Sequence, residues 1–219
     1  MKKNLTEIVF LLDRSGSMAG LESDTIGGYN AFLEKQKKAE GEAIITTVLF
    51  DTTRRVLYDR ADLNRIGPMR EDDYCVGGCT ALMDALGDTI DHMTTVHKYA
   101  REEDVPERTI FVITTDGMEN ASRRFTLNDI RLKIDDCKRN GWEFLFLGAN
   151  IDAVETARTY GIPESHSVRF HSDPRGTRLN YEVLSDAVMC MRKGHALRNN
   201  WKSRIEKDYA SRAKNSSST

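Results

Sequence analysis

The sequence lacks long apolar runs. No stretch approaches the ~20 uninterrupted apolar residues that a helix needs to cross a bilayer. The first apolar run meets a charge at Asp13, with no small-residue cleavage site behind it, which is typical of a first strand and not of a signal peptide. We therefore expect a cytoplasmic protein without a membrane anchor.

Cysteine is sparse and is not arranged for metal or redox chemistry. The four cysteines, Cys75, Cys79, Cys137 and Cys190, fall at spacings that match no Cys-x-x-Cys pattern. A chain of 219 residues with 39% apolar content can build one sizeable core without disulfides. We expect a monomer with reduced thiols.

Several catalytic motifs are also missing. Neither Gly-x-Gly-x-x-Gly nor a Gly-Lys-Ser/Thr loop occurs, which disfavours a nucleotide-binding fold. There is no Gly-x-Ser-x-Gly elbow, and the histidines show no convergence on a serine, which argues against a serine hydrolase. We interpret all five histidines as surface or capping residues: His92, His97, His166, His171 and His195.

The small net charge of −2 conceals an asymmetry. The segment 173–214 carries a charge of +5, so the rest of the chain carries −7. We interpret this basic segment as a solvated helix face, with a docking surface for an acidic partner or nucleic acid as the alternative. A nucleic-acid partner is not expected, because no aromatic residues are interleaved with the charge.

Apolar runs of strand length alternate with stretches of helical period, which predicts an α/β fold with helices on both faces of a doubly wound, mostly parallel open sheet. Only four residues separate the second and third runs, so these two must form an antiparallel hairpin at the sheet edge. About six strands are expected: Glu7–Leu12, Ala43–Phe50, Arg55–Tyr58, Thr109–Thr114, Glu143–Leu147 and Ser167–Phe170.

Four helices are expected between these strands. Their apolar positions are Ile26, Tyr29 and Leu33 in the first, Leu82 to Met93 in the second and Leu127 to Cys137 in the third, and Asp152 caps a short fourth. A long C-terminal helix with a break near Gly194 should follow. We divide the chain into a domain at 1–172, a basic helical segment at 173–214 that packs on the same domain, and a disordered tail at 215–219.

Three polar segments follow or flank the apolar runs. They are Asp13-Arg14-Ser15-Gly16-Ser17, Gly77-Gly78-Cys79-Thr80 and Thr114-Thr115-Asp116-Gly117. Ligands bind open α/β sheets beyond the carboxyl ends of the strands, where these segments fall. Hydroxyls and carboxylates without imidazole or thiolate favour Mg²⁺, with Mn²⁺ or Ca²⁺ as alternatives. Taken singly, each segment could equally be a turn or a helix cap.

Together these segments resemble the metal-ion-dependent adhesion site (MIDAS) of the von Willebrand factor type A (vWA) domain, in its stand-alone prokaryotic form. The resemblance covers roughly residues 6–168 and implies that the first and fourth strands are neighbours. It implies that Ser15, Ser17 and Thr80 bind the ion directly, while Asp13 and Asp116 act through water. It also implies a protein partner that presents an Asp or Glu to the metal, as in an adaptor or assembly factor.

The strongest alternative is an enzyme of the haloacid-dehalogenase type that acts on phosphate esters. It also places an Asp after the first strand, but it needs a second carboxylate two residues on, where this chain has Ser15. We therefore expect no catalysis.

The residues around the polar segments have simpler interpretations. Asp51, Asp152 and Glu119 are interpreted as turn or cap residues, with a metal-binding or supporting role beside the same site as the alternative. Cys79 is interpreted as a small buried residue, with an oxidation-sensitive thiol as the alternative. Gly77-Gly78 should give the Thr80 loop the backbone freedom to approach the ion.

Overall fold

The computed structural model describes residues 1–149 and 151–216. Six strands form one sheet: β1 (Lys2–Asp13), β2 (Glu42–Phe50), β3 (Arg54–Asp62), β4 (Pro106–Thr115), β5 (Glu143–Ala149) and β6 (Ser167–Phe170). Six α-helices accompany them: α1 (Glu22–Lys37), α2 (Leu82–Tyr99), α3 (Leu127–Arg139), α4 (Ala153–Thr159), α5 (Pro174–Arg192) and α6 (Ser203–Ser216). Every predicted strand is present, and the expected fold class is confirmed.

The strand order is β3-β2-β1-β4-β5-β6, and all neighbours are parallel except the β2–β3 hairpin. The turn of this hairpin is closed by Asp51, whose carboxylate accepts the Thr53 N–H at 2.6 Å. β3 ends at Asp62, four residues later than the sequence predicts. The register of its pairing with β2 shifts near Arg60, which has a φ of 47°, and this irregularity lets the strand continue beyond Tyr58. β1 lies between β2 and β4, as the resemblance implies.

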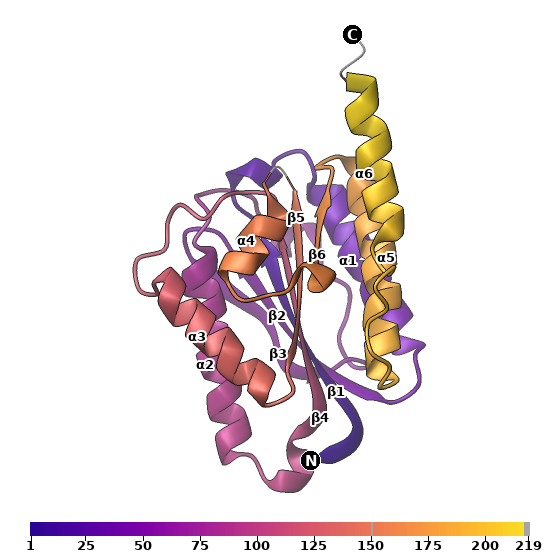
Figure 1. Ribbon diagram of the computed structural model, residues 1–219. Helices are drawn as coiled ribbons and strands as arrows, with labels where there is room; N and C mark the ends of the chain where they lie inside the picture. The colour runs from indigo at the N-terminus through magenta and orange to yellow at the C-terminus, as the bar shows by residue number, and fades with distance from the viewer. Residues whose placement is uncertain (150, 217–219) are drawn as a thin grey trace.

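The sheet is covered on both faces, so its inner strands bury side chains in both directions (Figure 1). Alternate residues of β1 serve different cores: Ile8, Phe10 and Leu12 pack under α1 and α5, whereas Val9 and Leu11 pack under α2 and α3. This two-sided burial explains why the strands read as continuous apolar runs and do not alternate.

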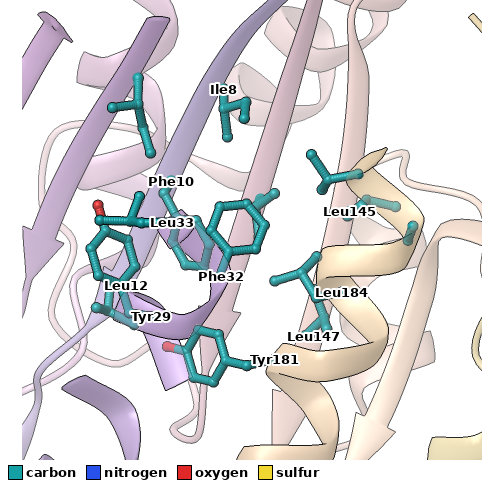
Figure 2. Close-up of a cluster of buried hydrophobic side chains, with 14 of the residues drawn as sticks. Ile8, Phe10, Leu12, Tyr29, Phe32, Leu33, Leu145, Leu147, Tyr181 and Leu184 are labelled. Atoms are coloured by element: carbon teal, nitrogen blue, oxygen red, sulfur yellow. The ribbon is translucent and has the colours of Figure 1, made fainter. Parts of the chain in front are cut away.

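Phe10 is the centre of the core under α1 and α5 (Figure 2). Its ring meets Tyr29 and Phe32 edge-on at centroid distances of 5.3 and 5.4 Å, and it stacks with Tyr181 at 6.2 Å. Phe10 thus joins β1 to α1 and, through Tyr181, to α5.

The C-terminal segment forms two helices, with the expected break at Gly194 (φ 74°). Trp201 anchors the connection, because its indole N–H donates to the Ser165 carbonyl at 2.7 Å. Several cations of this segment pair with acids inside it, as in Arg175–Asp208 at 2.6 Å and Arg204–Glu182 at 2.9 Å. α6 includes residues 215 and 216 of the predicted tail, and residues 217–219 lie outside the described residues.

The interpretation of all five histidines as surface or capping residues is wrong for His97. Its Nε2 lies 2.6 Å from the carboxylate of Glu7, which is fully buried in β1 and also pairs with Arg60 at 2.7 Å. A buried carboxylate is stable only with such partners, and a single apolar-flanked Glu in the sequence does not identify them.

Within the described chain, no helix has both the length and the apolar content of a transmembrane span.

Phe10→Ala should lower the free energy of unfolding by about 3–5 kcal/mol, because it opens a cavity among three aromatic rings. The measurement is urea denaturation, with Val56→Ala as the matched control at an exposed strand position. A loss for Phe10→Ala no greater than that of the control would contradict this description of the core.

Candidate metal centre

The first and second polar segments are joined through their backbones at the carboxyl edge of the sheet. The Gly16 N–H donates to the Gly78 carbonyl at 3.0 Å, and the Gly77 N–H donates to the Arg14 carbonyl at 2.9 Å. Gly78 has a φ of +70°, and a Cβ there would lie 2.8 Å from the Thr52 hydroxyl. The expected backbone freedom of this segment is therefore required at Gly78.

The serines of the first segment point toward the third segment. Ser15 Oγ lies 3.1 Å from Ser17 Oγ, and the Ser17 hydroxyl donates in turn to Asp116 Oδ1. Ser15 and Asp116 are buried, whereas Ser17 is exposed. The cluster therefore opens to solvent on the side of Ser17.

Gly117 reveals how closely the hydroxyls converge. A Cβ placed on this glycine would lie 2.8 Å from Thr80 Oγ1, 3.2 Å from Ser17 Oγ and 3.7 Å from Ser15 Oγ. Three hydroxyl oxygens from two separate loops thus lie within 4 Å of one position beside the Gly117 Cα, so any side chain at residue 117 would crowd them. With Asp116 bonded to Ser17 and Asp13 to the Ser15 backbone, the structure brings all five predicted residues together.

Asp13 has a different environment from the hydroxyls. It is fully buried, and both of its carboxylate oxygens accept hydrogen bonds, Oδ1 from the Ser15 N–H at 2.7 Å and Oδ2 from the Thr115 hydroxyl at 2.5 Å. Burial raises the pKa of Asp13, and the bonds from Thr115 and Ser15 oppose that rise. The Tyr74 hydroxyl donates to the Asp13 carbonyl. These contacts hold the start of the first loop, at Asp13, against the end of the sheet.

Ser172 is a member of the site that the sequence did not reveal. It follows β6, and its hydroxyl donates to Asp116 Oδ2 at 2.8 Å, so both carboxylate oxygens of Asp116 accept serine hydroxyls. The available signal was its position, since a serine just after the last parallel strand lies at the same edge as the other segments. Single serines follow many strands, so this position alone does not identify Ser172 as part of a site.

Asn120 and Glu119 hold the Thr80 loop. The Thr80 N–H donates to Asn120 Oδ1 at 3.0 Å, and the Asn120 N–H returns a bond to the Thr80 carbonyl at 3.0 Å. Glu119 accepts the Met83 N–H at the start of α2 at 2.8 Å, and Asp152 caps α4 through the Glu155 N–H. The interpretation of Glu119, Asp152 and Asp51 as turn or cap residues is confirmed.

Cys79 is exposed, so its interpretation as a small buried residue is wrong. Its N–H donates to the Thr52 hydroxyl at 2.8 Å, and the left-handed Gly78 before it leads the chain across the surface of the domain. Only Thr80, the next residue, is buried. In the turn Gly78-Cys79-Thr80, exposure changes to burial between two adjacent residues, and residue type alone does not predict which of them is buried.

The donor set suits a hard cation. Among the described residues, no group of three or more His, Cys, Asp and Glu side chains could hold a metal ion. The cluster around Gly117 instead offers hydroxyl oxygens, flanked by two carboxylates that already accept hydrogen bonds. Oxygen donors of this kind are ligands of Mg²⁺, Ca²⁺ and Mn²⁺. Met118, which follows Gly117 in the sequence, is exposed.

The fold matches solved vWA domains. No protein-family model and no curated protein sequence matches the chain. The vWF domain of the pilus tip protein Mfa5 from Porphyromonas gingivalis matches with a TM-score of 0.59 at 10% identity, over 84% of this chain and 94% of that one. Proximal thread matrix protein 1 from the mussel byssus, with a zinc-occupied MIDAS motif, matches with a TM-score of 0.56 at 14% identity.

A third match is a von Willebrand factor type A protein from Catenulispora acidiphila, with a TM-score of 0.54 at 15% identity over 86% of this chain. The alignment with the mussel protein covers 84% of this chain and 46% of the mussel protein. The alignment with the Catenulispora protein covers 43% of that protein, so this chain spans less than half the length of each. At these identities the likeness shows a shared vWA-type fold.

Gly78→Ala should lower the free energy of unfolding by about 1–3 kcal/mol, because alanine is strained at a φ of +70° and its Cβ would press on Thr52. Gly77→Ala is the matched control, since nothing lies within 4 Å of a Cβ at that glycine. Urea denaturation of the two variants tests the loop geometry, and equal losses would argue against it.

Proposed function

We propose that this chain is a non-enzymatic protein-binding module that captures an acidic residue of a partner protein through a divalent cation. The cation would be held by a complete metal-ion-dependent adhesion site: Ser15, Ser17 and Thr80 as direct ligands, with Asp13 and Asp116 in support. The observation that carries the proposal is the grouping of three hydroxyl oxygens from two loops, all within 4 Å of one position beside the Gly117 Cα. The vWA-type fold of the chain is consistent with an interaction module.

The carboxylates and the hydroxyls of the site have separate roles that suit such capture. Asp13 and Asp116 orient the first loop and the Ser17 hydroxyl, and Ser172 holds the second oxygen of Asp116. The three direct ligands are neutral, so they would quench little of the charge of an ion. When bound, a Mg²⁺ ion keeps exchangeable water and supplies an open position for a carboxylate oxygen. The exposed position of Ser17 leaves that side open to a partner.

Mg²⁺ is the ion that we propose, with Mn²⁺ or Ca²⁺ as alternatives. The hydroxyl and carboxylate donors favour these hard cations over zinc. The mussel protein carries zinc in its MIDAS motif, so a divalent ion in this fold has a precedent.

The setting that we propose is a cytoplasmic adaptor or assembly factor that acts as a monomer. The free cysteines, two of them exposed, support a reducing compartment. The ion pairs within the basic C-terminal segment support a solvated helix face in preference to a nucleic-acid surface.

A phosphotransferase is not favoured. Its nucleophile would be Asp13, but this carboxylate is fully buried and both its oxygens already accept hydrogen bonds. The general acid and base that the reaction needs would stand at position 15, where Ser15 carries no carboxylate. Robust phosphatase turnover that is lost in Asp13→Asn would overturn the proposal.

Ser15→Ala/Ser17→Ala should weaken Mg²⁺ binding by about 100-fold or more, because it removes two of the three converging hydroxyls. Calorimetric titration of Mg²⁺ and of Mn²⁺ into both proteins measures this loss. Ser23→Ala, at an exposed position on α1, is the control and should bind the ions like wild type. Equal uptake by the double variant would refute the site.

Gly117→Ala should abolish metal-dependent capture of a partner, because its Cβ would lie 2.8 Å from Thr80 Oγ1 and 3.2 Å from Ser17 Oγ and would push these hydroxyls apart. The measurement is affinity capture on immobilised protein with Mg²⁺ and with EDTA. Gly67→Ala is the matched control, since nothing lies within 4 Å of a Cβ there. A partner that is retained equally by Gly117→Ala, or equally in EDTA, would contradict capture through the cation.

A further inference from the structure

A pocket lined mainly by cationic side chains lies at the amino-terminal edge of the sheet, at the other end of β1 from the hydroxyl cluster. Its volume is about 400 Å³, and it lies where β1, the α1–β2 turn and the end of α5 meet. The α5–α6 turn beside it is drawn in gold near the bottom of Figure 1. The lining residues are Asn4, Glu40, Gly41, Arg108, Arg192 and Lys193. None of these six described residues has an aliphatic or aromatic side chain.

Arg192 is the unusual member of this lining. It is only 7% exposed, yet its described partners are all neutral: Nη1 donates to the Gln36 carbonyl at 2.6 Å and to Gln36 Oε1 at 3.2 Å, and Nη2 donates to the Gly41 carbonyl at 2.9 Å. Its Nε is buried without an acceptor among the described residues. Burial lowers the pKa of Arg192, but a guanidinium stays charged in proteins. A buried charge without an opposite charge is costly.

The other charges of the pocket do not neutralise Arg192. Arg108 pairs with Glu107 at 3.0 Å and lies across Gly194, where a Cβ would meet Arg108 Nη2 at 2.6 Å. Lys193 is exposed at the end of α5 and adds a second cation. Glu40 is the one acid of the lining and is exposed, so the pocket keeps a positive surplus.

We propose that this pocket binds the phosphoryl group of a small, strongly hydrophilic ligand. A phosphate monoester carries a charge of about −1.5 to −2 at neutral pH and has three acceptor oxygens, so it can meet Arg108 and Lys193 together, which the two oxygens of a carboxylate do less completely. The partly exposed Arg108 guanidinium can donate to phosphate oxygens, Lys193 supplies a point charge beside it, and the buried charge of Arg192 adds to the attraction.

The lining also restricts the rest of the ligand. A volume of about 400 Å³ exceeds what one phosphate needs and is within the range of small-molecule sites. A nucleobase would find no ring to stack on among the lining residues. The pocket therefore suits a sugar phosphate, polyol phosphate or short polyphosphate in preference to a nucleotide.

Calorimetric titration of metal-stripped protein with inorganic pyrophosphate tests this site. Removal of metal prevents pyrophosphate from binding through a cation at the hydroxyl cluster. We expect saturable binding that Lys193→Gln weakens about tenfold and that Glu40→Gln strengthens about threefold, because these surface changes remove an attraction and a repulsion. Arg65→Gln, whose side chain is 87% exposed and outside the lining, should leave the affinity unchanged.

Two further titrations distinguish this pocket from the hydroxyl cluster and from a surface that attracts any anion. Ser15→Ala/Ser17→Ala should bind pyrophosphate like wild type, which keeps the result independent of the proposed metal site. Citrate at matched ionic strength should bind at least tenfold more weakly than pyrophosphate. No saturable binding, equal binding of citrate, or identical affinities in Lys193→Gln and Glu40→Gln would each overturn the proposal.

Discussion

The parallel pairing of β1 with β4 is the constraint on which the site depends. Leu12 is in register with Thr114, so the two loops that carry Asp13 and Asp116 leave the sheet side by side. The Thr115 hydroxyl then joins the two strand ends by its bond to Asp13. Because both strands are buried on both faces, neither can slip by one residue without moving a whole row of core side chains to the wrong side. The core thereby fixes the positions of the polar loops.

Within this frame, carboxylates and hydroxyls have separate tasks. The carboxylates of Asp13 and Asp116 are satisfied by N–H and hydroxyl donors from within the site. These bonds offset the desolvation that raises the pKa of Asp13. The hydroxyl oxygens of Ser15, Ser17 and Thr80 lie within 4 Å of a common position beside the Gly117 Cα. A buried acid therefore organises the loops, and the neutral hydroxyls lie together beside it, with Ser17 exposed and Ser15 and Thr80 buried.

The sequence was sufficient for the features that have strong local signals. Strand runs and the short Asp51–Arg54 connection predicted the sheet and its antiparallel edge. The three polar segments marked the five candidate residues, and their clustering depended on the strand order. The strand order followed only from the resemblance, since no local pattern specifies which strands are neighbours. The features that were missed depend on contacts between distant residues. Ser172 reaches Asp116 across 56 positions, and His97 reaches Glu7 across 90.

The two ends of the sheet differ in electrostatics because the crossover helices run antiparallel to the strands. Helix N-termini, as at α2 directly after Thr80, lie at the carboxyl edge and favour negative charge. The cation that we propose would be attracted there by Asp13 and Asp116, and once bound it would add to the field that attracts the carboxylate of the proposed partner. At the amino edge the last carbonyls of α1 favour cations, and one of them, at Gln36, accepts the Arg192 guanidinium. That contact holds in the interior a positive charge whose partners among the described residues are all neutral, and the anion site that we propose at the amino edge rests on this charge despite the helix C-termini there.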